Sequence, residues 1–472
     1  MADKRWLALY VLCAGVLMIV LDTTVVNVAL PSIREDLRFT ETSLVWVVNA
    51  YMLTFGGFLL LGGRLGDLYG RRRLFLLGIT VFTLASLACG LANSQALLVG
   101  ARALQGLGGA LVTAIALSLI MNLFTEPADR AKAMGIYSFV CAGGGSIGVL
   151  AGGVLTSALN WHWVFLVNLP IGALVYALCR VLLPDSRGEA TRGRLDIGGA
   201  VTVTASSMLA VYAIVNGDIA LLAIAGVLLA VFLLIEARVA APLMPLGLFR
   251  LRSVAIANVV GVLWAAAMFA WFFISALYMQ LVLGYSALQV GLAFLPANLI
   301  MAAFSLGLSA RLVMRFGIRI PLAGGLVLAA AGLALFALSP AEGSFVIHVL
   351  PGMVLLGVGC GMALNPVLLA AMSDVAPSES GLASGIVNTS FMMGGALGLA
   401  VLASLAAART EALLASGVLP SIALTGGYRI AFVVGAAFAA AAALLSAVLL
   451  RAARQAPAQP PAAALALPAK NS

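Results

Sequence analysis

Charged side chains are scarce in this chain. Only 9% of its 472 residues are Asp, Glu, Lys or Arg, whereas 63% are hydrophobic, and a soluble domain carries about 25% charged residues. So few charges cannot cover a water-exposed surface, and lipid must therefore cover most of the protein. The composition predicts an all-α, polytopic membrane protein embedded in a lipid bilayer.

Histidine, cysteine and lysine are too few or too scattered to build a reactive centre. His162 and His348 stand alone, and the cysteines lie within apolar runs without a CxxC spacing, which is typical of small buried hydrophobic residues. No lysine lies in a GxxxxGK[ST] phosphate-binding loop. We therefore expect no metal, no cofactor, no catalytic residue and no ATP-driven step within the chain, so that an enzyme is the least favoured function.

The excess of positive charge has a topological explanation. The net charge is +9, but the basic residues lie in short loops between apolar runs, so we expect no nucleic-acid partner. Of the 26 Lys and Arg residues, 21 fall on the side of the N-terminus, 4 fall on the other side, and Arg102 lies inside an apolar run. The positive-inside rule then predicts a bacterial cytoplasmic (inner) membrane protein with both termini in the cytoplasm.

Apolar runs long enough to cross a bilayer as a helix, about 20 residues, occur fourteen times. The first run contains Asp22 and is not followed by an A-x-A cleavage site, so we assign it as a span and not as a signal peptide. The expected spans are 7–30, 44–63, 74–93, 96–123, 133–158, 163–183, 196–216, 219–237, 253–283, 288–310, 318–338, 344–371, 381–407 and 428–450.

Two motifs recur at nearly the same offset. LGGRLGDLYGRR at 61–72 matches LSARLVMRFGIR at 308–319, and a glycine pattern at 135–148 recurs at 385–398. Because both copies start on the same side, they predict two six-helix bundles related by a pseudo-two-fold axis along the membrane normal, with substrate bound between them. The expected division is an N-terminal bundle at 1–184, two linker helices at 185–252, a C-terminal bundle at 253–452 and a disordered cytoplasmic tail at 453–472.

Ionisable residues inside the spans are functional candidates. Asp22 in LDTTVVNVALP and Arg102 in GARALQGLGGA have expected depths of about 10–13 Å at 1.5 Å per helical residue, so the two could meet. Desolvation disfavours a carboxylate's charge and a nearby cation favours it, so access or a cationic substrate could switch the pair, as proton coupling requires. Asn27 and Gln105, from the same motifs, complete the predicted proton-coupling or substrate site. A static structural ion pair is the alternative.

The segment GGRLGDLYGRRR at 62–73 predicts a cytoplasmic gate. Its glycines permit a tight turn, and Asp67 is expected to face the N-terminus of the 381–407 helix, where an anion is favoured. Its arginines could reach Glu126 or Asp129. Ordinary positive-inside loop charge is the alternative. The members of this predicted gating loop are Gly63, Asp67, Gly70, Arg71 and Arg72.

Two further groups of residues lie within spans. The glycines of GGGSIGVLAGG at 143–153 would let helices pack backbone to backbone, and a formal GxGxxG match there is spurious because no strand precedes it. Aromatic and amide side chains in later spans could line a pocket, although lipid-facing aromatics and helix-bridging amides are the alternatives. The pocket candidates are Trp264, Trp271, Tyr278, Gln280, Asn298, Asn365 and Asn388.

These motifs, together with WHWVFLVNLPIG at 161–172 and PLMPLGLFR at 242–250, resemble the major facilitator superfamily, and more narrowly its fourteen-spanner drug/proton antiporters of the EmrB/QacA type. The resemblance implies that Asp22 and Arg102 couple protons. It also implies that Gly144, Gly148, Gly152 and Gly153 form the antiporter helix motif, in which Val149 stands where proline is usual.

The function expected from the residues and the resemblance together is proton-driven efflux of drugs or toxic metabolites by alternating access. The substrates would be small and amphipathic, including cations, and the proton gradient would supply the driving force. We expect a monomer, with outer-envelope adaptor proteins as candidate partners. A proton-coupled importer of a small nutrient is the main alternative.

Overall fold

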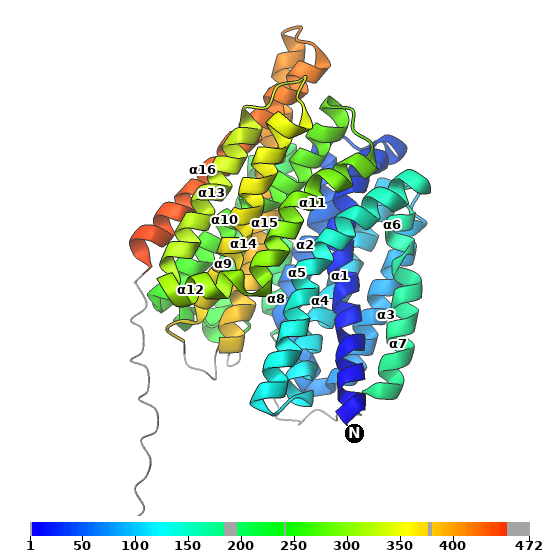
Figure 1. Ribbon diagram of the computed structural model, residues 1–472, viewed down its shortest axis with the longest axis vertical. Helices are drawn as coiled ribbons and strands as arrows, with labels where there is room; N and C mark the ends of the chain where they lie inside the picture. The colour runs from blue at the N-terminus through cyan, green and yellow to red at the C-terminus, as the bar shows by residue number, and fades with distance from the viewer. Residues whose placement is uncertain (1, 184–195, 240–241, 376–379, 451–472) are drawn as a thin grey trace, which may run out of the picture.

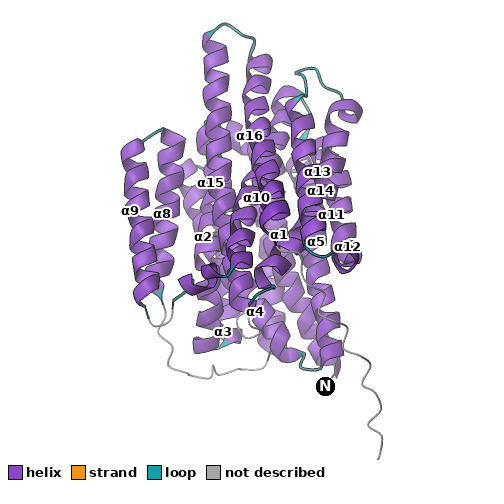
Figure 2. Cartoon of the chain, turned by 90° about the vertical axis from the view of Figure 1, so that its left-hand side faces the viewer, coloured by secondary structure: helices purple, strands orange, loops and turns teal. Residues whose placement is uncertain are grey.

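The computed structural model describes residues 2–183, 196–239, 242–375 and 380–450, and this part of the chain is built of helices without strands (Figure 2). The expected tail at 453–472 lies outside it. The first half contains α1 (Ala2–Leu37), α2 (Glu41–Tyr69), α3 (Arg71–Gly90), α4 (Gln95–Leu123), α5 (Pro127–Ala158), α6 (Trp163–Leu166) and α7 (Asn168–Leu182). The linker helices are α8 (Ile197–Asn216) and α9 (Ile219–Arg238). The second half contains α10 (Arg252–Leu277), α11 (Ala287–Ala303), α12 (Ser309–Phe316), α13 (Arg319–Ala337), α14 (Leu350–Met372), α15 (Ser380–Ala415) and α16 (Pro420–Leu449).

Polar caps set where several of these helices begin. Thr40 and Ser43 form a reciprocal capping box at the start of α2, and Ser94 caps α4. Asp196 and Asp218 cap the two linker helices. Each cap satisfies a backbone N–H that has no partner within the helix, so short polar turns between long apolar runs fix the helix ends.

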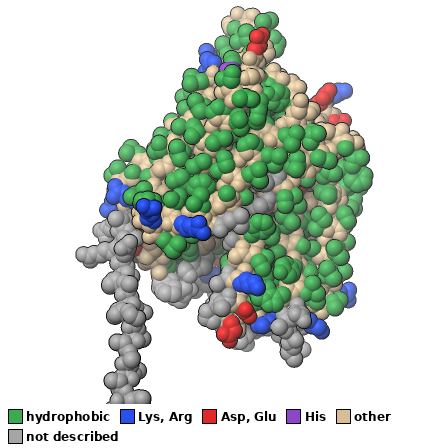
Figure 3. All heavy atoms as spheres, in the orientation of Figure 1, with side chains coloured by type: hydrophobic (Ala, Val, Ile, Leu, Met, Phe, Trp, Pro, Cys, Tyr) green, Lys and Arg blue, Asp and Glu red, His purple; other side chains and the backbone are tan. Residues whose placement is uncertain are grey.

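Twelve helices in the described part are long and apolar enough to cross a membrane. The remaining two expected spans, 133–158 and 288–310, correspond to α5 and α11, whose described apolar parts are only Ile147–Ala158 and Ala287–Ala303. The second of these ends early because the backbone continues as a π-helical turn, Phe304–Leu308, in which Gly307 has a φ of 130°. Hydrophobic side chains cover the face seen in Figure 3, and charged ones gather toward its two ends, as a bilayer requires.

The helix pairings of the first half recur in the second. α1 packs on α5 and α2 on α4, while α10 packs on α15 and α11 on α14. Across the halves, α5 contacts α11 and α15 contacts α2, which are equivalent pairings under the two-fold relation that the sequence repeats predicted. Figure 1 shows the two halves side by side, with α15 and α16 extending beyond the rest at the end away from the N-terminus.

Glycine makes the closest of these contacts. A Cβ atom at Gly152 of α5 would lie 2.7 Å from the carbonyl oxygen of Val25 in α1, and one at Gly398 of α15 would lie 2.1 Å from Cβ of Ala266 in α10. Both distances are impossible for real side chains, so the two halves use the same device of backbone-to-backbone packing between equivalent helices.

The linker helices form a hairpin beside the two bundles. α8 and α9 pack on each other, and α8 also contacts α2 and α15 (Figure 2). A cavity of about 60 Å³ lies at this junction, lined by Gly57, Leu60, Val203, Phe232, Leu243, Met244, Thr389, Ser390 and Met393. The hairpin therefore touches both halves of the molecule.

Candidate functional site

The centre of the candidate site is an ion pair between α1 and α4. Oδ2 of Asp22 lies 2.5 Å from Nη1 of Arg102, and each side chain is 1% exposed. Asp22 and Arg102, which the sequence placed at similar depths in the membrane, are therefore in direct contact. A buried ion pair needs further hydrogen bonds to offset the loss of hydration of both charges, and the surrounding helices supply them.

Gln105, one helical turn after Arg102, links the two charges. Its Oε1 accepts a hydrogen bond of 2.6 Å from Nη1 of Arg102, and its Nε2 donates one of 2.6 Å to Oδ1 of Asp22. The amide therefore holds both partners in one geometry. The same Nε2 lies 2.8 Å from Oγ of Ser86 in α3.

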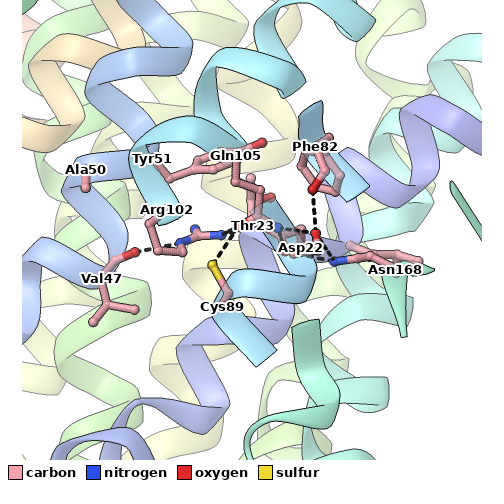
Figure 4. A network of polar contacts seen from close by, with 12 residues as sticks. Asp22, Thr23, Val47, Ala50, Tyr51, Phe82, Cys89, Arg102, Gln105 and Asn168 are labelled. Atoms are coloured by element: carbon pink, nitrogen blue, oxygen red, sulfur yellow. Dashed lines mark hydrogen bonds and ion pairs between the residues drawn. The ribbon is translucent and has the colours of Figure 1, made fainter. Parts of the chain in front are cut away.

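Asn168, the first residue of α7, completes the network (Figure 4). Its Nδ2 donates to Oδ1 of Asp22 across 3.1 Å and lies 3.4 Å from Oγ of Ser86. Three helices, α1, α4 and α7, thus meet at one buried carboxylate, and Ser86 of α3 accepts from both of its amide donors. Neither Asn168 nor Ser86 was predicted, although Asn168 lies in the quoted WHWVFLVNLPIG motif as a polar residue in an apolar run.

Arg102 is held on its other side by backbone and aromatic groups. Its Nε donates to the carbonyl oxygen of Val47 in α2 across 2.8 Å, and its guanidinium carbon lies 4.4 Å from the ring centroid of Tyr51. A second ring, Phe165 of α6, lies 5.7 Å away. Cation–π contacts of this kind stabilise a desolvated guanidinium, so the arginine is fixed in place for its contact with Asp22.

Asn27 lies apart from this network. Its amide donates to the carbonyl oxygen of Thr23 within α1, across 3.2 Å. The structure therefore brings together three of the four residues predicted for the coupling site, and the assignment of Asn27 to substrate remains a prediction.

The predicted gating loop is the tight connection between α2 and α3. Gly70 has a φ of 97° and separates the two helices without another loop residue, a conformation that L side chains rarely adopt. Gly63 has open space beside it, the nearest atom to an added Cβ being 4.0 Å away. Arg71 begins α3, and Arg72 donates to the carbonyl oxygen of Arg180 across 2.5 Å.

The acidic residues that were predicted to act at this loop are only partly described, and one of them pairs with another segment. Asp129 forms an ion pair of 3.7 Å with Arg5, from the start of α1. The side chain of Asp67, and the chain at 376–379 before its expected partner helix, lie outside the described part. The role of Asp67 in gating therefore stays a prediction.

The glycines of the predicted antiporter helix face two neighbours. Gly144, Gly148 and Gly152, spaced four residues apart, lie against α1, while Gly153 lies against the first residues of α11. α5 thus contacts both α1, which carries Asp22, and α11 of the opposite half. Val149, at the position where proline is usual, is buried, and its carbonyl oxygen lies 3.0 Å from the Cβ that Gly291 of α11 would carry.

Three of the predicted pocket residues, Trp264, Trp271 and Tyr278, are buried in the second half, and Gln280 bridges to the first. Trp264 and Trp271 are 0% and 1% exposed, and their indole nitrogens have no hydrogen-bond partner among the described residues. Tyr278 donates to the carbonyl oxygen of Pro340 across 2.7 Å, and Gln280 donates to that of Val28 in α1 across 3.0 Å. Their part in binding a substrate stays a prediction.

The three polar pocket candidates from later spans differ in burial. Asn298 is buried with its Nδ2 unpaired within the described chain, whereas Asn365 and Asn388 are half-buried. A buried amide without a hydrogen-bond partner costs free energy of folding. Of the three, Asn298 is therefore the residue whose amide would gain most from a hydrogen bond to a polar group of a bound molecule.

Comparison with known proteins identifies the family. The model of the Major Facilitator Superfamily matches residues 12–399. The chain belongs to this superfamily. Crystal structures of a nucleoside transporter (TM-score 0.69, 11% identity, covering 94% of this chain and 100% of that one) and of an inward-facing bacterial homologue of the human lysosomal transporter Spinster (TM-score 0.68, 17% identity, covering 96% and 98%) share the fold.

Curated relatives within the superfamily are much closer in sequence. The puromycin resistance protein of Streptomyces alboniger is 41% identical over 94% of this chain and 90% of its own length. The cephamycin export protein of Amycolatopsis lactamdurans is 40% identical over 95% and 93%, and the lincomycin resistance protein of Streptomyces lincolnensis is 38% identical over 85% and 84%. The chain is thus a multi-pass membrane transporter of this superfamily whose similar relatives are named for antibiotic resistance and export.

Proposed function

We propose that the chain is a drug/proton antiporter of the fourteen-spanner branch, which exports small amphipathic antibiotics from the bacterial cytoplasm. The names of its relatives support export as the direction of transport. The observation that carries the proton-coupling part is the buried pair of Asp22 and Arg102, enclosed by amide donors from α4 and α7. Both termini would lie in the cytoplasm, as the loop charges predict.

The geometry supports a simple coupling cycle. While the network is closed, Arg102, Gln105 and Asn168 occupy the carboxyl oxygens of Asp22, and the carboxyl group is shielded from water. When the outer side opens, a proton reaches the carboxylate, the ion pair is lost, and the guanidinium and amide groups must find new partners. The groups of this network come from α1, α3, α4 and α7. Protonation therefore changes how α1 packs against the other three helices, and α5 follows through its glycine contacts with α1.

The proton gradient is large enough for this task. One charge moving through 100 mV supplies about 2.3 kcal/mol, and one pH unit supplies about 1.36 kcal/mol per proton. A single proton exchanged for a neutral molecule therefore sustains a concentration gradient of more than about 100-fold.

Transport into everted membrane vesicles tests the proposal. Radiolabelled puromycin should accumulate when a proton gradient is imposed, and an uncoupler should abolish accumulation at constant ATP. Asp22→Asn should remove the gradient-driven component, whereas Glu342→Gln, which changes an exposed carboxylate in a loop, should leave it intact. Accumulation that persists with the uncoupler would refute proton coupling, and uptake in the opposite direction would favour the importer.

A further inference from the structure

A second buried acidic pair lies at the base of the linker hairpin, far along the chain from Asp22. Asp196 immediately precedes α8, and Glu236 lies in the last turn of α9; they are 4% and 3% exposed. Each uses one carboxyl oxygen to accept a backbone hydrogen bond: Oδ1 of Asp196 from the N–H of Gly199 (2.7 Å), and Oε2 of Glu236 from the N–H of Met244 (3.0 Å).

The other oxygen of each carboxyl group points into the same small space. Oδ2 of Asp196 and Oε1 of Glu236 would lie 2.5 Å and 2.8 Å from a Cβ atom on Gly199, and neither has a donor among the described residues. Glycine at this position thus leaves room for two carboxyl groups to face each other. Two buried carboxylates in such a site cannot both stay ionised without a partner, and a shared proton satisfies both free oxygens at once.

The charges around this pair are few. Among the described groups, Arg64 of α2 is the cation that acts on Glu236, and its Nη2 donates to the carbonyl oxygen of Pro242 across 3.0 Å. The α15 residues at the adjoining cavity, Thr389, Ser390 and Met393, are uncharged. With one described cation nearby, a second negative charge on the pair has no partner among the described residues.

The same groups connect the hairpin to the predicted gating loop. Arg64 belongs to the 62–73 segment, and the chain at 242–244 lies between it and Glu236. Leu61 of α2, Ala200 of α8 and Leu243 form a small buried apolar cluster there. The end of α2 that carries the predicted gating loop therefore packs directly on the part of the hairpin that contains the two acids.

We propose that Asp196 and Glu236 form a proton-binding site that holds one proton between them and keeps the linker hairpin attached to the 62–73 segment. The attachment is present while the pair is singly protonated and is lost as rising pH removes that proton, because two adjacent carboxylates then repel each other. This site is separate from the Asp22 network and does not depend on proton-driven export.

Infrared difference spectra of the full-length protein in lipid nanodiscs, titrated with pH, test the shared proton. The carbonyl-stretch component of a protonated carboxyl group should titrate in the wild type and persist in Asp22→Asn, which removes the signal of the other buried acid of the described chain. In that Asp22→Asn background the component should disappear when either Asp196→Asn or Glu236→Gln is added. Loss in only one of the two linker variants would place the proton on a single residue and overturn sharing. A wild-type spectrum without this component would overturn the site altogether.

Hydrogen exchange of the 242–248 peptide tests the attachment. A Cβ at Gly199 would displace the carboxyl groups, whereas one at Gly198 would meet only ordinary contacts of 3.7 Å and 4.0 Å. Gly199→Ala should raise exchange at the Met244 amide roughly tenfold, the factor for a lost charge-assisted hydrogen bond, and Gly198→Ala should not. In the wild type the same rise should appear at alkaline pH, after correction for intrinsic exchange, and be absent in Glu236→Gln. Equal exchange in both glycine variants, or a wild-type profile that does not change with pH, would refute the attachment.

Discussion

Asn168 of α7 donates a hydrogen bond to Asp22 of α1 across 3.1 Å. This contact connects the last long helix of the first bundle to the first one, at a carboxylate that also receives Arg102 and Gln105. Asn168 is fully buried, so no water molecule can accept the hydrogen bond of its amide in place of the Asp22 carboxylate. Asn168 of α7 and Gln105 of α4 therefore position the same oxygen of Asp22 from two different helices.

Replacing Asn168 with leucine should weaken both stability and transport. The substitution removes one donor from a buried carboxylate at similar volume, a loss of about 1–3 kcal/mol. We expect a lower unfolding temperature of the purified protein and slower proton-driven puromycin transport. Asn122→Leu is the matched control, because its amide is exposed and donates, within the described chain, to the carbonyl oxygen of Ser118 in its own helix. Equal effects of the two variants would show that Asn168 has no special role.

The close packing of α5 on α1 makes a sharp prediction for two glycines of one helix. A Cβ at Gly152 would lie 2.7 Å from a backbone oxygen, whereas one at Gly145 would lie 3.9 Å from the nearest atom, Cγ2 of Thr24. Gly152→Ala should therefore destabilise the protein by about 1–3 kcal/mol, seen as a lower unfolding temperature in detergent. Gly145→Ala should be close to neutral, and similar unfolding temperatures for the two variants would contradict this packing.

The contact between α5 and α11 at the end away from the N-terminus should open during transport. The N–H of Leu288 donates to Oγ of Ser157 across 3.1 Å, and Gly153 and Ala287 lie in the same interface. In a cysteine-free background, a short thiol cross-linker between Ser157→Cys and Leu288→Cys should abolish puromycin transport. Each single cysteine, treated in the same way, should leave it unchanged. Full transport by the cross-linked double variant would mean that this interface stays closed throughout the cycle.

The sequence predicted the fold well because lipid imposes a simple rule on it. Apolar runs of bilayer length and the asymmetry of loop charge identify helices without any knowledge of packing. The repeat of LGGRLGDLYGRR and the glycine pattern then indicated which helices correspond between the halves. The π-helical turn after α11 was missed because a single left-handed glycine within an apolar run, Gly307, leaves no periodic signal.

The candidate sites were only partly predictable. Asp22 and Arg102 could be paired because depth follows directly from residue count along a helix. Asn168 and Ser86 could not be predicted, since the contact of Asn168 with Asp22, and that of Ser86 with the two amide donors of Asp22, depend on how α7 and α3 are rotated about their own axes. Asp196 and Glu236 lie 40 positions apart at the two ends of a hairpin, and only the folded hairpin shows that both face Gly199.

The last prediction concerns whether Asp22 and Arg102 act as one unit. Removing either partner leaves an unpaired buried charge, which costs about 3–5 kcal/mol. Asp22→Asn leaves the guanidinium without its anion, and Arg102→Ala leaves the carboxylate with only two amide donors, from Gln105 and Asn168. Each single variant should therefore lose stability and proton-driven transport.

The double variant Asp22→Asn/Arg102→Ala removes both charges, so it should be no less stable than either single variant. Transport should be no worse than in the single variants, because residues that act together are not additive. The measurements are unfolding temperature and puromycin accumulation in vesicles for all four proteins, each at two pH values on either side of neutral. Any accumulation that remains in the double variant should not respond to the imposed proton gradient, since the Asp22 carboxyl group is gone. Additive losses in both measurements would mean that the 2.5 Å contact is a static feature and that Asp22 carries the coupling alone.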